Sequence, residues 1–229
     1  MDGILLVDKP VLWTSHDVVD FVRRVSGQKR VGHCGTLDLM ATGLLVLLVG
    51  EATKRSAEFS GMDKDYRGSM RLGTVTDTWD LEGRILSEKS PEAVSRQDVE
   101  KIFKSLEGVQ SITPPSYSAL RKDGKRYYEL ARKGVMLEPA PREITVSAFR
   151  LEGFETPEAY FFMSCSKGTY VRSLCHSVGE KAACGAVLSS LVRTRIGPWH
   201  LSAAQKVPAL ASATPADWQK HLLDRKSVV

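Results

Sequence analysis

Residues 29–54 are Lys-Arg-Val-Gly-His-Cys-Gly-Thr-Leu-Asp-Leu-Met-Ala-Thr-Gly-Leu-Leu-Val-Leu-Leu-Val-Gly-Glu-Ala-Thr-Lys. A basic pair leads into a glycine-rich loop with one carboxylate, Asp38, and the loop is followed by an apolar run, Leu44 to Val49, that predicts a buried strand. An aspartate on a loop anchored to a core strand is well placed to act on a substrate, but an aspartate in such a loop is more often only a turn residue or a helix cap. The rest of the chain decides between these two interpretations.

Outward from this stretch, short apolar or alternating runs predict strands, and runs with apolar residues at helical spacing predict helices. Strands are expected at residues 3–7, 44–49, 66–72, 84–86, 144–151 and 160–165. Helices are expected from an N-cap at Ser15 to Gly27, at 95–106 with Ser95 as the cap, at 127–133, at 171–181, and from a cap at Thr214 onward. Because strands and helices mix without a regular β-α-β alternation, the pattern favours an α+β fold over a doubly wound sheet.

The composition is that of a globular protein without a membrane span. The chain has 229 residues, of which 42% are hydrophobic, and no apolar run approaches the roughly 20 residues that a span requires. The first ten residues lack the basic segment of a signal peptide. The four cysteines, Cys34, Cys165, Cys175 and Cys184, form no C-x-x-C pair, so we expect reduced thiols and a cytoplasmic location.

Positive charge is concentrated in one segment. The net charge is +5, and residues 119–135 contain six basic and two acidic residues, with three tyrosines in or beside the segment. Lysine and arginine neutralise phosphates and aromatic rings stack on bases, so this composition is typical of a nucleic-acid surface. A solvated amphipathic helix is the ordinary alternative.

Several familiar chemistries are excluded. The chain has neither a Walker loop nor a G-x-G-x-x-G motif, and the consecutive side chains of Ser15, His16 and Asp17 diverge too much to form a catalytic triad. The pairs His33-Cys34 and Cys175-His176 could supply four metal ligands, but adjacent residues seldom share one metal, so no metal site is expected.

Eight segments in order resemble the motifs of one family, the bacterial tRNA pseudouridine-55 synthases (TruB family). The Asp38 loop resembles G-H-x-G-T-L-D, whose aspartate carries the chemistry in that family. The other segments are 3–15 (the K-P and T-S motif), 50–54 (G-x-A-T-K), 64–67 (K-x-Y), 72–78 (L-G-x-x-T-D-T), 114–132 (P-P-x-Y-S-A-L followed by Y-x-x-A-R), 165–174 (C-S-K-G-T-Y-x-R-x-L) and 191–193 (L-x-R). Three positions depart from the family pattern: Leu12 replaces Gly, Leu39 replaces Pro, and Ser177 replaces Asp.

The resemblance implies a pseudouridine synthase fold. It would be a single α+β catalytic domain over residues 1–229, with a mixed, largely antiparallel sheet flanked by helices and a central cleft. A basic insertion at residues 108–142 would grip RNA. Residues 201–229 would form a short C-terminal tail, too short for the RNA-binding PUA domain that most bacterial relatives carry.

The resemblance also implies an activity, the isomerisation of uridine-55 in the T-loop of tRNA to pseudouridine, without cofactor or metal. Asp38 would act at the sugar, either by attack on C1′ or by removal of the 2′ proton, and Arg172 would keep it ionised. Tyr66 would stack on the flipped uracil and relay the C5 proton. The implied substrate-binding residues are His33, Tyr170, Leu191, Lys9, Arg121, Lys125 and Arg126.

The implied partner is the T-arm of tRNA, with no protein partner and no membrane, and the implied state is a monomer. Two alternatives stay open: a synthase of the same fold that acts on another RNA, and a non-catalytic RNA chaperone that docks on the T-arm. A carboxylate facing an anionic RNA backbone disfavours the chaperone, because binding alone does not require it.

Overall fold

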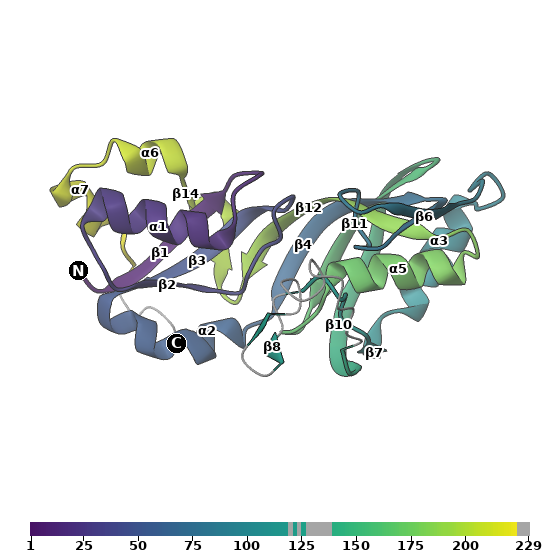
Figure 1. The fold of residues 1–229 in the computed structure, drawn as a ribbon, viewed down its shortest axis with the longest axis horizontal. Helices are drawn as coiled ribbons and strands as arrows, with labels where there is room; N and C mark the ends of the chain where they lie inside the picture. Colours follow the sequence, from purple (N-terminus) through teal and green to yellow (C-terminus); the bar gives the residue numbers. More distant parts are fainter. Residues whose placement is uncertain (119–120, 123–124, 127–138, 224–229) are drawn as a thin grey trace. The chain divides into compact units, whose positions relative to one another are not determined.

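The computed structural model describes residues 1–118, 121–122, 125–126 and 139–223 (Figure 1). The chain folds into two compact units, unit 1 of residues 1–66 and 191–229 and unit 2 of residues 67–190. Both boundaries fall inside strands, β4 (Lys64–Leu72) and β12 (Ala186–Ile196), so each of these strands contributes to both units. The single domain expected over residues 1–229 stays a prediction.

Unit 1 is built on a mixed sheet with β1 (Gly3–Lys9) and β3 (Thr42–Val49) as its central pair. These two strands run antiparallel over seven residue pairs. Parallel pairs join β1 to β14 and β3 to β12, and β2 runs antiparallel to the end of β3. The other elements of unit 1 are α1 (Ser15–Ser26), β2 (Val31–Cys34), the 3₁₀ turn η1 (Gly50–Arg55), α2 (Ser56–Ser60), β13 (Trp199–His200), the 3₁₀ turn η2 (Leu201–Ala203), β14 (Gln205–Lys206), α6 (Val207–Ala211) and α7 (Pro215–His221).

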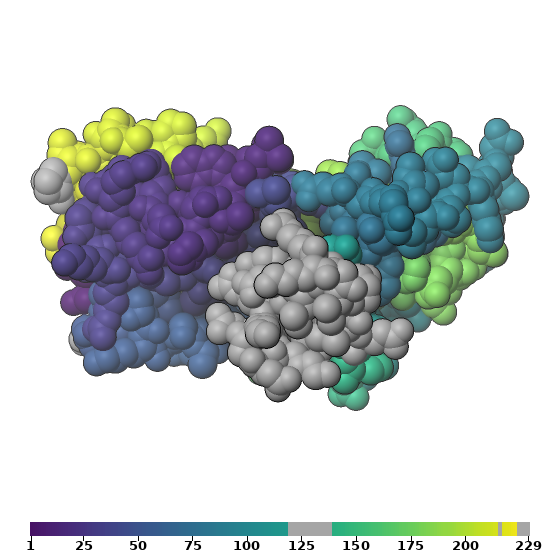
Figure 2. All heavy atoms as spheres, in the orientation of Figure 1, coloured from purple at the N-terminus to yellow at the C-terminus, as the bar shows by residue number. Residues whose placement is uncertain are grey.

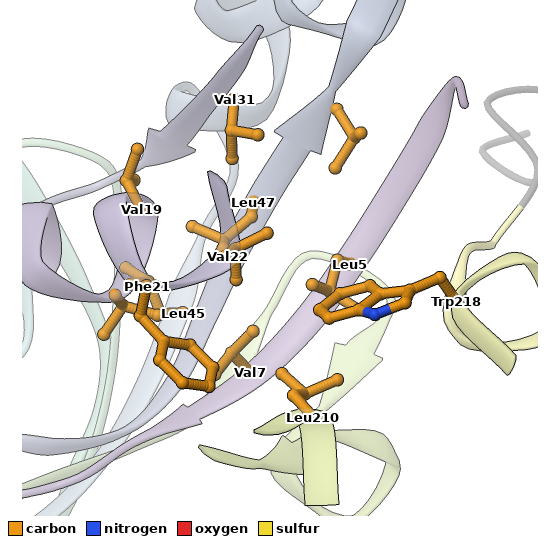
Figure 3. Packing of buried hydrophobic residues seen from close by; sticks show 12 residues of the cluster. Leu5, Val7, Val19, Phe21, Val22, Val31, Leu45, Leu47, Leu210 and Trp218 are labelled. Atoms are coloured by element: carbon orange, nitrogen blue, oxygen red, sulfur yellow. The ribbon is translucent and has the colours of Figure 1, made fainter. Parts of the chain in front are cut away.

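Both faces of the unit 1 sheet are buried. Successive side chains of β1 and β3 point to opposite sides of the sheet, and other elements cover each side. On one face Leu5 and Leu47 pack with Phe21 of α1 and with Leu210 and Trp218 near the C-terminus (Figure 3). In Figure 2 the yellow C-terminal segment accordingly lies against the purple N-terminal segment. The opposite face packs on α2 and β13. Burial on both faces explains the unbroken apolar run of residues 44–49, which is confirmed as a strand.

Unit 2 is organised around antiparallel strands. β10 (Arg142–Glu155) pairs with β7 (Gly108–Ile112) on one side and β11 (Glu158–Cys165) on the other. Helix α3 (Arg96–Ser105) places Phe103 on Phe149 of β10, with the ring centroids 3.9 Å apart, and Phe149 meets Phe161 edge-on at 5.6 Å. The remaining elements of unit 2 are β5 (Thr74–Thr76), β6 (Ile85–Glu88), β8 (Arg121–Lys122), β9 (Lys125–Arg126) and α5 (Val171–Lys181).

The predicted fold class is confirmed: the structure is α+β, with a mixed, largely antiparallel sheet and helices that pack on it. The helix at 171–181 and the caps at Ser95 and Thr214 are also confirmed. Among the described residues, no helix is both long and apolar enough to cross a bilayer.

Some predicted elements were wrong. The N-cap of α1 is Thr14, whose side chain accepts a hydrogen bond from the Asp17 amide, while Ser15 is the first helical residue. Residues 31–34 form β2 where a loop was expected. Strands β5, β7 and β12 were not anticipated. The helix expected at 127–133 lies outside the described residues.

Candidate active site

Asp38 lies half-buried on the loop between β2 and β3. Beside it, the Leu37 amide donates to Ser15 Oγ at 2.9 Å, and Ser15 Oγ donates back to the Leu37 carbonyl at 3.3 Å. On the other side, the Leu12 amide donates to the Leu39 carbonyl at 3.0 Å. Because the residues on both sides of Asp38 are hydrogen-bonded to other segments, the position of the carboxylate is determined by tertiary contacts and not by the turn alone.

Lys9 supports the same loop from inside the protein. Its side chain is fully buried, and Nζ donates to the carbonyls of Trp13 at 2.5 Å, Pro10 at 3.0 Å and Leu39 at 3.5 Å. Burial lowers the pKa of Lys9 to about 8, and the charge of Asp38 opposes that decrease. Lys9 was expected to bind substrate, which stays a prediction; in the structure its ammonium group binds three main-chain oxygens, one of them on Leu39, the residue after Asp38.

Tyr66 lies near the start of β4 and is 6% exposed. Burial lowers the pKa of the Arg193 guanidinium in β12, and the neighbouring hydroxyl of Tyr66 opposes that decrease. The same guanidinium donates from Nε to the Leu44 carbonyl at 2.8 Å and from Nη2 to the Gly35 carbonyl at 3.0 Å. The two ends of the Asp38 loop therefore share one buried cation, which neighbours Tyr66.

The other two expected binding residues of unit 1 lie in strands. His33 is half-buried in β2 and is paired with Leu47 of β3. Leu191 is buried in β12, two residues before Arg193. His33 therefore stands on the strand that leads into the Asp38 loop, and Leu191 on the strand that contributes Arg193.

In unit 2, Arg172 lies in the first turn of α5, where it is buried. Its Nη1 donates to the Thr78 carbonyl and its Nη2 to the Tyr117 carbonyl, both at 3.0 Å. Nη1 also lies 3.5 Å from Oδ2 of Asp80, which is equally buried. Asp38 belongs to the other unit, so its expected pairing with Arg172 stays a prediction.

Tyr170 is the N-cap residue of α5 and is half-buried. The guanidinium carbon of Arg142 lies 5.6 Å from the centre of its ring, a cation–π distance. The expected RNA-binding residues Arg121, Lys125 and Arg126 belong to the two-stranded ribbon β8–β9, in which Arg121 is paired with Arg126. The rest of the expected basic segment, 119–120, 123–124 and 127–135, lies outside the described residues.

Sequence reasoning missed three residues that organise these sites: Arg193, Asp80 and Ser15. Arg193 and Asp80 carried a signal: Arg193 is a charged residue inside a segment matched to a family motif, and Asp80 lies two residues after the end of another. Ser15 was interpreted as a helix cap, and nothing in the sequence shows that its hydroxyl turns to Leu37 instead.

Comparison with known proteins identifies the family. The model described as "TruB family pseudouridylate synthase (N terminal domain)" matches residues 23–171. A tRNA pseudouridine synthase B of Opitutus terrae is 43% identical over 97% of this chain and 92% of its own length. Another, from Syntrophotalea carbinolica, is 44% identical over 97% of this chain and 73% of its own length.

A solved structure agrees on the fold. A chain in the crystal structure of a Cbf5–Nop10–Gar1 complex superposes with a TM-score of 0.75 at 24% identity, over 97% of this chain and 60% of that one. With these matches, the chain belongs to the TruB family of pseudouridylate synthases, as the motifs indicated.

Proposed function

We propose that this protein isomerises uridine-55 in the T-loop of tRNA to pseudouridine. The observation that carries the proposal is the identity of 43% with a tRNA pseudouridine synthase B over nearly the whole of both chains. The position of Asp38 supports it, because a half-buried carboxylate on a loop with hydrogen bonds on both sides is suited to act on a bound substrate.

The chemistry requires one carboxylate near the sugar. The N1–C1′ bond breaks, the uracil leaves as a stabilised anion and turns over, and C5 joins C1′. Asp38 would either attack C1′ or remove the 2′ proton, and both routes require the ionised form. The reaction is an isomerisation without net oxidation or hydrolysis, so the proposed mechanism includes no cofactor.

The target base must first leave its stack, which costs a few kcal/mol. Tyr66 and Leu191 would contact the uracil, Tyr170 would line its pocket, and His33 would fill the gap left by the flipped base. We assign Tyr66 the relay of the C5 proton. Lys9 would act on the substrate only through Asp38 and its loop, because its side chain is fully buried.

The basic residues Arg121, Lys125 and Arg126 would contact phosphates of the T-arm, with the chain acting as a monomer in the cytoplasm. Their support is the positive charge of the segment, whose lysines and arginines would release counterions on binding RNA.

Asp38→Asn tests the proposal, because it preserves size and shape and removes the charge. Purified wild type should convert uridine-55 of unmodified tRNA to pseudouridine. Asp38→Asn should lose at least a thousandfold in single-turnover rate and retain its affinity for tRNA within about threefold. Asp20→Asn, at an exposed position of α1, serves as the matched control and should leave the rate unchanged.

Two results would contradict the proposal. A rate for Asp38→Asn within tenfold of wild type would exclude Asp38 from the chemistry. Wild type that binds tRNA and forms no pseudouridine would favour the RNA chaperone instead.

A further inference from the structure

Apolar side chains are exposed to solvent directly beside Asp38. Leu39, the next residue along the chain, is 38% exposed, and Leu12 is 69% exposed. The Leu12 amide donates to the Leu39 carbonyl at 3.0 Å, so these two leucines are neighbours although they lie on different loops. Val11, next to Leu12, is exposed as well. A single exposed leucine is ordinary, but a group of apolar side chains beside a candidate catalytic carboxylate indicates a contact surface.

Leu12 also has an unfavourable backbone conformation. Its φ is +63°, in the left-handed region that residues with a Cβ rarely adopt. Glycine, which the family pattern has at this position, would make the same turn without strain. Because the leucine side chain is largely exposed, its own burial does not offset the cost. Strained residues of this kind cluster at binding and active sites, which points to a role for the side chain outside the fold.

Lys9 holds both loops in place. Its Nζ donates to the carbonyls of Pro10 and Trp13, on either side of Leu12, and to the carbonyl of Leu39. The ring of Trp13 packs edge-on against Phe21, with the centroids 5.8 Å apart. The exposed leucines are therefore presented on a backbone that is fixed before a ligand arrives, which lowers the entropic cost of binding.

The charge around the two leucines favours the uncharged parts of an RNA. Residues 10–15 contain no ionisable side chain, and residues 36–50 contain only Asp38. The ammonium group of Lys9 is buried against main-chain carbonyls. A phosphate would find no exposed cation in these two segments and would be repelled by the Asp38 carboxylate. The groups that suit this surface are the ribose and the faces of the bases.

Asp38 determines which nucleotides come near the surface. In the proposed function its carboxylate acts at the sugar of the target uridine, and the Cα of Leu39 is only about 3.8 Å from that of Asp38. A nucleotide next to the target uridine is therefore within reach of Leu39 and Leu12. When the uridine leaves its stack, a base face of that neighbour loses its apolar contact.

We propose that Leu12 and Leu39 form an apolar contact for a T-loop nucleotide that flanks the target uridine, packing on the base face that flipping exposes. Apolar side chains that replace lost base stacking are a known means of holding an unstacked nucleic acid. The inference deepens the proposed function and rests on it.

The first experiment separates apolar from ionic contact. Binding of a T-arm stem-loop is measured at several salt concentrations in an Asp38→Asn background, in which no turnover is expected. Leu12→Asn with Leu39→Ser should weaken binding at least fivefold and change the slope of log affinity against log salt by less than about 0.3, because no counterion release is lost. Asparagine tolerates the left-handed backbone, so the turn is kept. A smaller loss of affinity, or a larger change of slope, would overturn the proposal.

The second experiment tests the contact with a base. Two further stem-loops are abasic at the nucleotide on the 5′ side or on the 3′ side of the target uridine. With one of them, the double variant and its parent should differ in affinity by less than twofold, since the base that the leucines contact is gone. If the full loss persists with both stem-loops, the leucines contact no flanking base and the proposal fails.

Leu81→Ser with Leu86→Ser is the matched control. Both leucines are exposed in unit 2, outside the two loops beside Asp38, and their loss should leave the affinity for the stem-loop unchanged. An equal loss of affinity in this control would mean that exposed leucines contribute to binding in general, and it would overturn the specific assignment.

Leu12→Gly separates binding from strain. It relieves the backbone and should still weaken binding at least twofold, because the side chain is gone. If the double variant does not fold, Leu12→Gly and Leu39→Ser decide singly, and unchanged affinity in both would overturn the proposal. Sedimentation that shows a wild-type dimer and a monomeric double variant would mean that a second copy covers the surface instead. Absence of pseudouridine with wild type would reject the proposed function, while the binding measurements would still test the leucines.

Discussion

Lys9, Ser15 and Arg193 reach the Asp38 loop through its main-chain atoms. Lys9 donates to the Leu39 carbonyl, Ser15 exchanges hydrogen bonds with Leu37, and Arg193 donates to the Gly35 carbonyl. Contacts to main-chain atoms fix the path of the loop whatever side chain it carries. The carboxylate of Asp38 is therefore preorganised by residues that need not touch a substrate themselves.

Individual residues of the candidate site could be predicted from the sequence, but their partners could not. The glycine-rich motif identified Asp38, and the positions of Tyr66 and Arg172 followed from the resemblance. That Arg193 donates to Gly35 and Leu44, or that Arg172 faces Asp80, depends on strands and loops far apart in the chain. A single sequence holds no local signal for such contacts.

At the residue scale, Asp80→Asn should destabilise the protein by about 3 kcal/mol, because it removes the charge of Asp80 from beside the buried guanidinium of Arg172. Urea unfolding measures the change. Asp77→Asn, in the same turn, is the control: the half-buried Asp77 accepts a hydrogen bond from the Arg84 amide at 2.9 Å, and the loss of this bond should cost about 1 kcal/mol. Equal losses of unfolding free energy for the two variants would show that the buried Arg172–Asp80 pair contributes no more than the single hydrogen bond of Asp77.

Leu12→Gly should stabilise the protein by about 0.5 kcal/mol. Leu12 is 69% exposed and has φ +63°, a left-handed conformation that costs a residue with a Cβ roughly 1–2 kcal/mol. Glycine removes that cost, but it also raises the conformational entropy of the unfolded state, which cancels part of the stabilisation. Val11→Gly next to it, without the left-handed backbone, should instead destabilise by up to about 1 kcal/mol. A lower melting temperature for Leu12→Gly would mean that the Leu12 side chain stabilises the fold despite its exposure.

At the element scale, predictability followed the strength of local patterns. Helix α5 was predicted with its observed bounds, because its apolar spacing and preceding glycine are both local signals. Strand β12 was missed because its sequence holds the buried Arg193 and the half-buried Ser189, and only their tertiary partners show why polar residues stand in this strand. Apolar runs predict strands well, but they do not predict strands that hold polar side chains with hydrogen-bond partners elsewhere in the fold.

The two-stranded ribbon β8–β9 is the element assigned to phosphate contact. Arg121→Glu with Lys125→Glu should weaken T-arm binding and reduce the slope of log affinity against log salt by about 1 to 2, because fewer counterions are released. Filter binding at several salt concentrations measures the slope. Arg96→Glu with Lys104→Glu on α3 makes the same change in net charge at exposed positions and should leave the slope unaltered. The same slope for both double variants would assign the effect to overall charge.

At the scale of the whole molecule, the division into two units was not foreseen. It follows from which long-range strand pairs form, and composition along the chain gives no boundary at residues 66–67 or 190–191. Asp38, Tyr66 and Leu191 belong to unit 1, and Tyr170 and Arg172 to unit 2. The proposed mechanism therefore draws on residues from both units.

The proposed contacts predict how much of tRNA the enzyme needs. Every residue assigned to RNA acts on the target uridine, its neighbours in the T-loop, or phosphates of the T-arm. A minimal T-arm stem-loop should therefore have a kcat/KM within about tenfold of that of full tRNA at the same salt concentration. A stem-loop with cytidine in place of the target uridine is the control and should give no product. A loss beyond about a hundredfold, roughly 2.7 kcal/mol of transition-state binding, would require contacts to RNA beyond the T-arm.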